Sequence, residues 1–177
     1  MKNYIFVQTL GPLIDRFHPR VLVETGTHRG RSGCYMVQQA LQYHPDVEYH
    51  GFDLFDIATD ATDREEINGK GHGSYETAQA RFQALAQINP GFRFELHRGF
   101  TTETFVKPIR ADLAYIDGGH STTTVLHDYS MVRESRVIVF DDYQLDSVKQ
   151  ALAEACIADR IEPFLTKKTA QAILINS

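Results

Sequence analysis

Short runs of apolar residues alternate with segments of helical periodicity along most of this 177-residue chain. Some of the runs, such as 137–140, are apolar throughout, as is typical of strands buried on both faces of a parallel sheet. The alternation predicts an α/β fold with a doubly wound, mostly parallel sheet and helices on both faces. About seven strands are expected, at 20–24, 47–53, 92–97, 111–117, 136–140, 161–166 and 170–175.

The helices expected between these strands span 32–43, 74–88, 122–133 and 147–157, and each has an apolar face. The last two strands are so close in sequence that they should form an antiparallel hairpin at the sheet edge. The opening segment, 1–18, has a helical pattern over 3–17 that we expect to be interrupted at Gly11 and Pro12. Length and composition together predict a single domain, 1–177.

Residues 56–73 do not fit this compact plan. The segment is rich in acids and glycines, lacks apolar periodicity and directly follows the end of an expected strand. Long segments of this kind are either mobile lids or solvated insertions. Both interpretations stay open, and 56–73 is a candidate mobile lid.

The net charge of −5, without any cluster of Lys or Arg, argues against nucleic acid as a partner. No apolar run has the length of a membrane span and the N-terminus does not resemble a secretory signal, so we expect a cytoplasmic protein. Cys34 and Cys156 fall at apolar positions of expected helices and should be buried free thiols, which fits a reducing cytoplasm. A homodimer is one option for the oligomeric state.

The segment 21–32 passes from a β-branched run through an acid and a turn with Gly26 and Gly30 into a helical pattern. Glycine suits a turn whose backbone lies close to another group, because it tolerates positive φ and has no Cβ. The glycine spacing is that of neither a dinucleotide fingerprint nor a phosphate-binding loop. By itself the turn fits a cofactor site and an ordinary strand–helix joint equally well.

Four of the first five expected strands end in an acid, with Glu24, Asp53, Asp117 and the Asp141–Asp142 pair at these ends. The carboxyl ends of parallel strands meet at one edge of the sheet, where ligands bind. Clustered carboxylates repel one another unless a cation lies among them, so a positively charged ligand is expected. Asp53 could accept both ribose hydroxyls of a nucleoside, with a helix-capping or loop acid as the alternative.

Asp117, Asp141 and Asp142 end two neighbouring strands, and an all-oxygen set suits Mg²⁺, or Mn²⁺ or Ca²⁺. The alternative is that Asp141 and Asp142 cap the next helix. His120, just after Asp117, could take a proton from a substrate hydroxyl, or it could be structural. Gly118 and Gly119 are expected to leave this rim open to a substrate.

These motifs, in the order 24–32, 51–53, 112–120 and 137–143, resemble those of class I S-adenosylmethionine-dependent methyltransferases of the small, metal-dependent O-methyltransferase type. The macrocin- and mycinamicin-type sugar methyltransferases and their bacterial homologues are most similar, and the catechol and caffeoyl-CoA O-methyltransferases are more distant. The resemblance implies a Rossmann-like fold and divalent-metal-assisted O-methylation of a small hydroxylated molecule. A non-catalytic S-adenosylmethionine-binding protein of the same fold is the alternative.

The resemblance also implies roles for individual residues. Cofactor contacts are expected from Glu24, Gly26, Thr27, Gly30, Ser32, Asp53, Gly99, Phe100 and Asp117. Asp117, Asp141 and Asp142 would hold the metal, and His120 and Asp117 would be the catalytic residues. Many relatives have an acid where this chain has Gly119, so the role of general base falls to His120. Relatives also tend to have a tyrosine shortly after the histidine, which is absent here, so the methyl acceptor is not implied.

Overall fold

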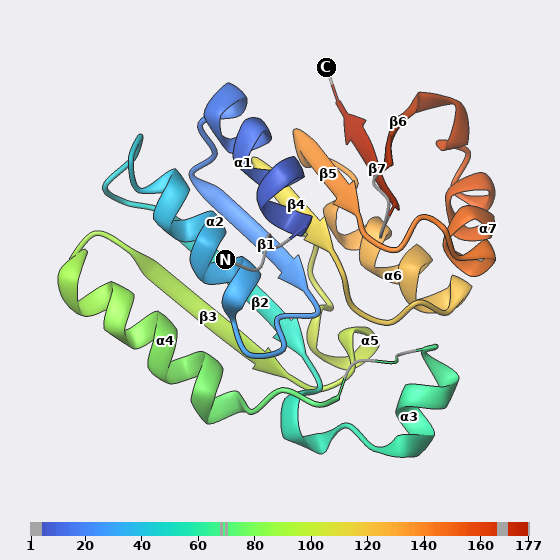
Figure 1. Ribbon diagram of the computed structural model, residues 1–177, viewed down its shortest axis with the longest axis horizontal. Coiled ribbons are helices and arrows are strands. Elements are labelled where there is room, and N and C mark those ends of the chain that lie inside the picture. Colours follow the sequence, from blue (N-terminus) through green and yellow to red (C-terminus); the bar gives the residue numbers. More distant parts are fainter. Residues whose placement is uncertain (1–4, 68, 70, 166–169, 177) are drawn as a thin grey trace.

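The computed structural model describes residues 5–67, 69, 71–165 and 170–176, apart from the side chains of residues 5 and 6. Seven strands form one sheet in the order β3-β2-β1-β4-β5-β7-β6 (Figure 1). The five strands β3, β2, β1, β4 and β5 are mutually parallel, and β7 is antiparallel to β5 and β6. The strands are β1 (Val21–Thr25), β2 (Glu48–Asp53), β3 (Arg93–Arg98), β4 (Leu113–Ile116), β5 (Val137–Phe140), β6 (Ile161–Leu165) and β7 (Ala170–Ile175).

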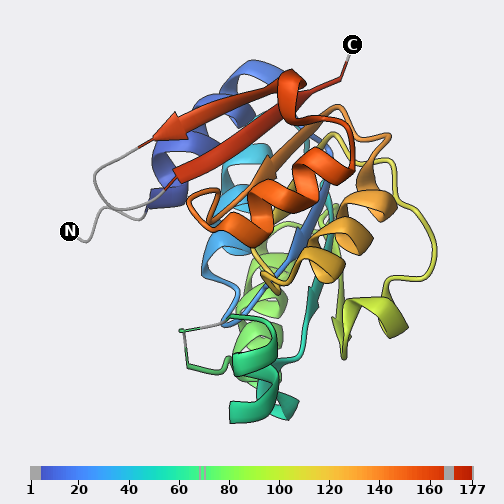
Figure 2. The same ribbon diagram turned by 90° about the vertical axis from the view of Figure 1, so that its right-hand side faces the viewer.

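The predicted α/β sheet with a C-terminal antiparallel hairpin is therefore confirmed, and the hairpin forms one edge of the sheet (Figure 2). All four residues of β4 and of β5 are buried, as their apolar sequences predict for strands covered on both faces. Residues 166–169, which include the end of the sixth expected strand and the hairpin turn, lie outside the described residues, as do residues 3 and 4 of the opening helix.

Helices cover both faces of the sheet (Figures 1 and 2). One buried cluster joins Leu22 of β1 to Met36 and Phe82 from the helices on one face, and a second joins Val23 to Val125 on the other. Adjacent strand residues point to opposite faces, which is why one strand serves both cores. The helices are α1 (Ile5–Phe17), α2 (Arg31–Ala40), α3 (Asp60–Glu65), α4 (Tyr75–Ile88), α5 (Thr101–Thr104), α6 (Thr122–Val132) and α7 (Asp146–Glu154), with 3₁₀ turns at Phe55–Ile57 and Ala158–Arg160. None of the helices in the described ranges is long and apolar enough to cross a bilayer.

The predicted interruption of the first helix is wrong, because α1 runs through Pro12 without a break. Leu10 and Ile14 are fully buried in the core cluster that also contains residues of α2. A Cβ at Gly11 would lie 2.6 Å from the Tyr35 hydroxyl, so the glycine lets α1 approach α2 closely. Packing of this face stabilises the helix although Pro12 has no backbone N–H to donate.

The prediction for the two cysteines is correct only for one. Cys34 lies half-buried in α2, where desolvation raises the pKa of its thiol to about 12. Cys156 is exposed, because α7 ends at Glu154 and Cys156 follows with a left-handed φ of 57°. Cys156 therefore falls inside the predicted helix 147–157 but beyond the end of the helix that the structure shows.

The polar segment 56–73 has local structure and lies beyond the carboxyl ends of β1 and β2 (Figure 1). Its helix α3 begins with a reciprocal cap, in which the Thr59 hydroxyl accepts from the Thr62 amide and the Thr62 hydroxyl accepts from the Thr59 amide. No residue of α3 is buried, so this helix has no core of its own. Contacts to the neighbouring loops must hold it in place.

Candidate functional site

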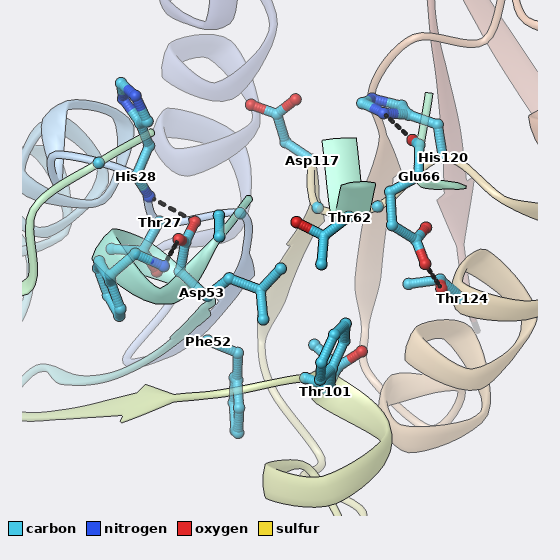
Figure 3. A pocket seen from close by; sticks show the side chains of 18 of the residues that line it. Thr27, His28, Phe52, Asp53, Thr62, Glu66, Thr101, Asp117, His120 and Thr124 are labelled. Atoms are coloured by element: carbon cyan, nitrogen blue, oxygen red, sulfur yellow. Dashed lines mark hydrogen bonds between the residues drawn. The ribbon is translucent and has the colours of Figure 1, made fainter. Parts of the chain in front are cut away.

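A cavity of about 1100 Å³ lies at the carboxyl edge of the sheet, bordered by α3 and by the loops that follow β1, β2, β4 and β5 (Figure 3). Pockets for drug-sized ligands are usually about 300–1,000 Å³, so this cavity has room for a cofactor and part of a second molecule. Most of the site residues predicted from the sequence line it, namely Gly26, Thr27, Ser32, Asp53, Gly99, Phe100, Asp117, His120, Asp141 and Asp142. Glu24 and Gly30 are not among its described lining residues.

The two glycines of the first turn make room for neighbouring parts of the chain. Gly26 has a φ of 85°, and a Cβ there would overlap the backbone carbonyl of Asp117. Gly30 precedes α2 with a φ of 72°, and a Cβ there would lie 3.0 Å from the Phe82 ring. The close approach predicted for this turn is therefore at least partly to the protein itself, although Gly26 also borders the cavity.

Glu24 lies beneath the first turn, fully buried and not among the described lining residues, and its contact with a cofactor stays a prediction. Its carboxylate accepts hydrogen bonds from the hydroxyls of Ser32 and Tyr49. The Tyr49 hydroxyl lies in turn 3.3 Å from that of Thr27. A buried carboxylate needs such partners, and here they tie β1, β2 and the start of α2 together below the cavity floor.

Asp53 faces the cavity from the end of β2 and also organises the loops around it (Figure 3). One carboxylate oxygen accepts from the His28 amide at 2.8 Å, and the other accepts from the Phe55 amide. Burial raises the pKa of this carboxyl group, while the two amide hydrogen bonds oppose the rise. Each carboxylate oxygen can accept a second hydrogen bond, so a loop-ordering role and a role in ligand binding are compatible.

The acids that end β4 and β5 are arranged differently from the prediction. Potential ligand atoms of Asp117, His120 and Asp142 all lie within 4.8 Å of one another, whereas Asp141 is not in this group. The Asp141 carboxylate accepts instead from the Tyr115 hydroxyl at 2.9 Å and from the Gln171 amide at 3.0 Å. The candidate group in the structure thus differs from the predicted set of Asp117, Asp141 and Asp142 by having His120 in place of Asp141.

The backbone explains why two adjacent aspartates separate in this way. Asp142 has a left-handed φ of 51°, which turns its side chain away from the direction of Asp141 and toward His120. Neither aspartate caps the next helix within the described chain, because α7 begins after Leu145 without a side-chain cap. The capping alternative is therefore not what the structure shows.

His120 is 6% exposed and has an oxygen atom near each ring nitrogen. Nδ1 lies 3.3 Å from the carbonyl oxygen of Glu66, and Nε2 lies 2.7 Å from Asp142 Oδ2. Nε2 nevertheless makes no hydrogen bond of good geometry to any described residue. A neutral imidazole can donate from only one nitrogen, so the Nε2 side of the ring has room in its hydrogen bonding for a cation.

Glu66, on the segment after α3, is a site residue that the sequence did not indicate. Its carboxylate accepts from the Thr124 hydroxyl at 2.8 Å and from the Ser121 amide at 3.3 Å, and its carbonyl accepts from the His120 amide (Figure 3). A Cβ at Gly119 would overlap the Glu66 carboxylate. Gly119 therefore makes room for this segment, and it also lines the cavity together with Gly118.

The sequence profile of a family described as a methyltransferase domain matches residues 23–143. The chain belongs to the methyltransferase-domain family. The matched range of this methyltransferase contains the glycine turn, Asp53 and the Asp117–His120–Asp142 cluster. No curated protein sequence matches the chain.

Solved structures of methyltransferases share the fold of this methyltransferase. The O-methyltransferase NovP is 21% identical, with a TM-score of 0.67 over 97% of this chain and 78% of its own. TomG from Streptomyces achromogenes, an O-methyltransferase solved with S-adenosylmethionine, is 16% identical, with a TM-score of 0.61 over 96% of this chain and 79% of its own. PaMTH1 from Podospora anserina, solved with S-adenosylhomocysteine, is 12% identical, with a TM-score of 0.62 over 100% of this chain and 80% of its own. Family and fold together confirm the predicted class, a class I S-adenosylmethionine-dependent methyltransferase.

Proposed function

We propose that this methyltransferase transfers a methyl group from S-adenosylmethionine to a hydroxyl oxygen of a small molecule, with the help of a divalent cation. One observation carries the proposal: the Asp117–His120–Asp142 cluster and the ribose-binding candidate Asp53 line the same cavity (Figure 3). The cofactor would lie between them, with its ribose at Asp53, its adenine near Gly99 and Phe100, and its methionine half near the first turn.

The charge of the cavity suits the chemistry of methyl transfer. The sulfonium of the cofactor is positive and the thioether product is neutral, so a carboxylate-lined cavity favours the cofactor over the product. In the reaction the sulfur–methyl bond breaks as the oxygen–methyl bond forms, and the hydroxyl proton must leave. Asp117, Asp142 and His120 supply the negative charge and the proton acceptors at this end of the cavity.

The residues that would hold a divalent cation are Asp117, His120 and Asp142. The fit rests on His120 Nε2, which is buried beside a carboxylate without a good hydrogen bond to a described residue. When bound, a divalent ion lowers the pKa of a hydroxyl group next to it and orients that group. Two carboxylates with one imidazole suit Mn²⁺ better than the Mg²⁺ expected from an all-aspartate set.

The segment around α3 would exclude water from the reaction. Glu66 fixes it to the start of α6, and Thr62 faces the space between Asp53 and Asp117 (Figure 3). Exclusion of water strengthens the interaction of the carboxylates with a cationic cofactor. The candidate lid predicted from the sequence thus has a specific task in this proposal.

Calorimetry with S-adenosylhomocysteine and a turnover assay with catechols, sugars and hydroxylated natural products, with and without Mn²⁺, test the proposal. We expect binding of S-adenosylhomocysteine, and turnover that is lost with a chelator and restored by Mn²⁺. Absence of binding would contradict the proposed cofactor. Binding without turnover of any acceptor would favour the non-catalytic alternative, and turnover insensitive to chelation would remove the metal from the proposal.

A further inference from the structure

A second group of metal-ligating side chains lies outside the cavity, on strands β2 and β3. The parallel register places His50 opposite Glu95, and Phe52 opposite His97. Since side chains alternate between faces along a strand, His50, Glu95 and His97 all lie on the same face of the sheet. Potential ligand atoms of these three residues lie within 4.8 Å of one another.

The spacing of these atoms is close to that of a tetrahedral metal site. Glu95 Oε2 lies 3.7 Å from His50 Nδ1 and 3.6 Å from His97 Nε2. Zinc bonds to nitrogen and oxygen of about 2.1 Å place neighbouring ligand atoms of a tetrahedron ~3.4 Å apart. The Glu95 side chain is 67% exposed, so it can move to shorten both of these distances around an ion.

The imidazole of His50 has a partner for its second ring nitrogen. His50 Nε2 lies 2.9 Å from Glu48 Oε1, so it donates its proton there and its Nδ1 presents a lone pair to Glu95 and His97. A carboxylate that binds the second ring nitrogen is the usual partner of a metal-ligating histidine. His50 Nδ1 and His97 Nε2 are both buried atoms without a hydrogen-bond partner in the described part of the chain.

The surrounding charges keep the group suited to a cation. The nearby cation is Arg93, whose guanidinium lies 3.6 Å from the second oxygen of Glu48 and is compensated by it. Glu95 then contributes the negative charge of the group.

We propose that His50, Glu95 and His97 form a binding site for a divalent transition-metal ion of the zinc type, separate from the methyl-transfer cavity. Two imidazoles and one carboxylate are a ligand set that zinc takes with a fourth position open to water. An ion here would tie the edge strand β3 to β2. The His97 ring stacks on Phe52 at a centroid distance of 4.3 Å, and Phe52 lines the cavity, so the ion would also brace the cavity wall from behind.

The test uses the full chain without a histidine tag, stripped of metal with a chelator and titrated with Zn²⁺ by calorimetry and thermal unfolding. Asp117→Asn/Asp142→Asn serves as the background, because it weakens the cavity cluster and leaves the strand cluster intact. On this background we expect one Zn²⁺ per chain and a rise in melting temperature. We expect Glu95→Gln and His97→Gln to weaken Zn²⁺ binding by about tenfold or more, and Glu48→Gln to weaken it by about 10–100-fold.

His44→Gln is the matched control, because His44 is a surface histidine whose ring binds a backbone carbonyl away from β2 and β3. It should leave the Zn²⁺ affinity unchanged. Equal Zn²⁺ affinity in the background protein and in Glu95→Gln would overturn the proposal, as would a background protein that binds no Zn²⁺. Glu95 is exposed, so this variant decides the matter even if His97→Gln does not fold.

The result is separable from the proposed methyl transfer. Glu95→Gln should bind S-adenosylhomocysteine as the unchanged protein does, since Glu95 does not line the cavity as described. Failure of zinc binding therefore leaves the methyltransferase proposal standing. Failure of cofactor binding likewise leaves the zinc site standing.

Discussion

The Asp53 carboxylate is at once a structural and a ligand-facing group. The amides of His28 and Phe55 donate to its two oxygens, so it connects the loops after β1 and β2, and it also borders the cavity. Asp56, one turn further on, forms an ion pair with Arg98. These two acids are close in sequence but differ in what they can offer a ribose.

We predict that Asp53→Asn weakens binding of S-adenosylhomocysteine by about 1–3 kcal/mol, the range for hydrogen bonds to a charged group. Asparagine keeps only one acceptor oxygen, so one of the two loop amides loses its partner, and thermal unfolding of the variant measures that separate effect. Titration calorimetry measures it, with Asp56→Asn as the control that should change affinity little. Equal affinities for both variants and the unchanged protein would contradict the ribose role of Asp53.

Two candidate roles of His120, metal ligand and general base, can be separated with one variant. As a metal ligand, His120→Gln should lower Mn²⁺ affinity by roughly tenfold or more. If His120 is a general base alone, the variant should bind Mn²⁺ normally while kcat falls by ~10²-fold or more. The geometry at Asp142 leads us to expect the first result, together with a lower kcat.

Manganese titration and a pH–rate profile of both proteins, once an acceptor is found, decide between these roles. Loss of the acid limb of the profile with normal Mn²⁺ affinity would assign His120 as the base predicted from the sequence. Full activity with an unchanged profile would leave it with a purely structural role.

At the scale of elements, polar contacts hold α3 and the described residues after it in place. Glu66 accepts from Ser121 and Thr124 at the start of α6, and the His28 ring lies 2.6 Å from the carbonyl oxygen of Gly71. A helix without buried residues gains little from the hydrophobic effect, so these contacts determine how often it opens.

We predict that Glu66→Gln raises the amide hydrogen exchange of 60–66 by about 5–30-fold, because charged hydrogen bonds of roughly 1–2 kcal/mol are weakened. S-adenosylhomocysteine should slow the exchange of the same segment in the unchanged protein. Exchange measured by mass spectrometry tests both, with Glu65→Gln as a neighbour of equal charge that is exposed. Equal exchange in the two variants would show that Glu66 does not hold this segment.

At the scale of the whole molecule, one buried acid works against stability. Asp128 on α6 is fully buried, and desolvation raises its pKa to about 6. The hydroxyls of Thr101 and Thr25 oppose this shift, yet neither carboxylate oxygen makes a hydrogen bond of good geometry to the described residues. Ionisation of Asp128 is therefore easier in the unfolded chain than in the folded one.

We predict that Asp128→Asn stabilises the protein by about 1–3 kcal/mol at pH 8, from a pKa shift of about two units. The sign follows from the raised pKa of Asp128 in the folded protein. The free-energy cost of ionising the buried carboxyl is absent below the pKa of the unfolded chain, near 4, grows as pH rises toward 6, and is constant above. Urea unfolding of both proteins from pH 4 to pH 8 measures it. A difference that is the same at pH 4 and pH 8 would mean that charge is not its cause.

The positions of the strands and of the acids at their ends could be predicted from the sequence, because hydrophobic periodicity and local residue types determine them. Residues that are adjacent in the sequence are enough to identify the apolar runs of β4 and β5, the short link between β6 and β7, and the acids at the strand ends. Since the carboxyl ends of parallel strands meet at one edge, the place of the cavity followed as well. The interruption predicted at Pro12 failed, because packing against α2 outweighs a local preference.

Only the tertiary structure decided which of these residues meet. The φ of Asp142 directs one aspartate to His120 and leaves Asp141 with Tyr115 and Gln171. Glu66 reaches α6 across more than fifty residues of sequence, and the register of β2 and β3 brings His50 beside Glu95. Such contacts depend on backbone turns and strand register that arise from the whole core, and no local pattern of residue types encodes them.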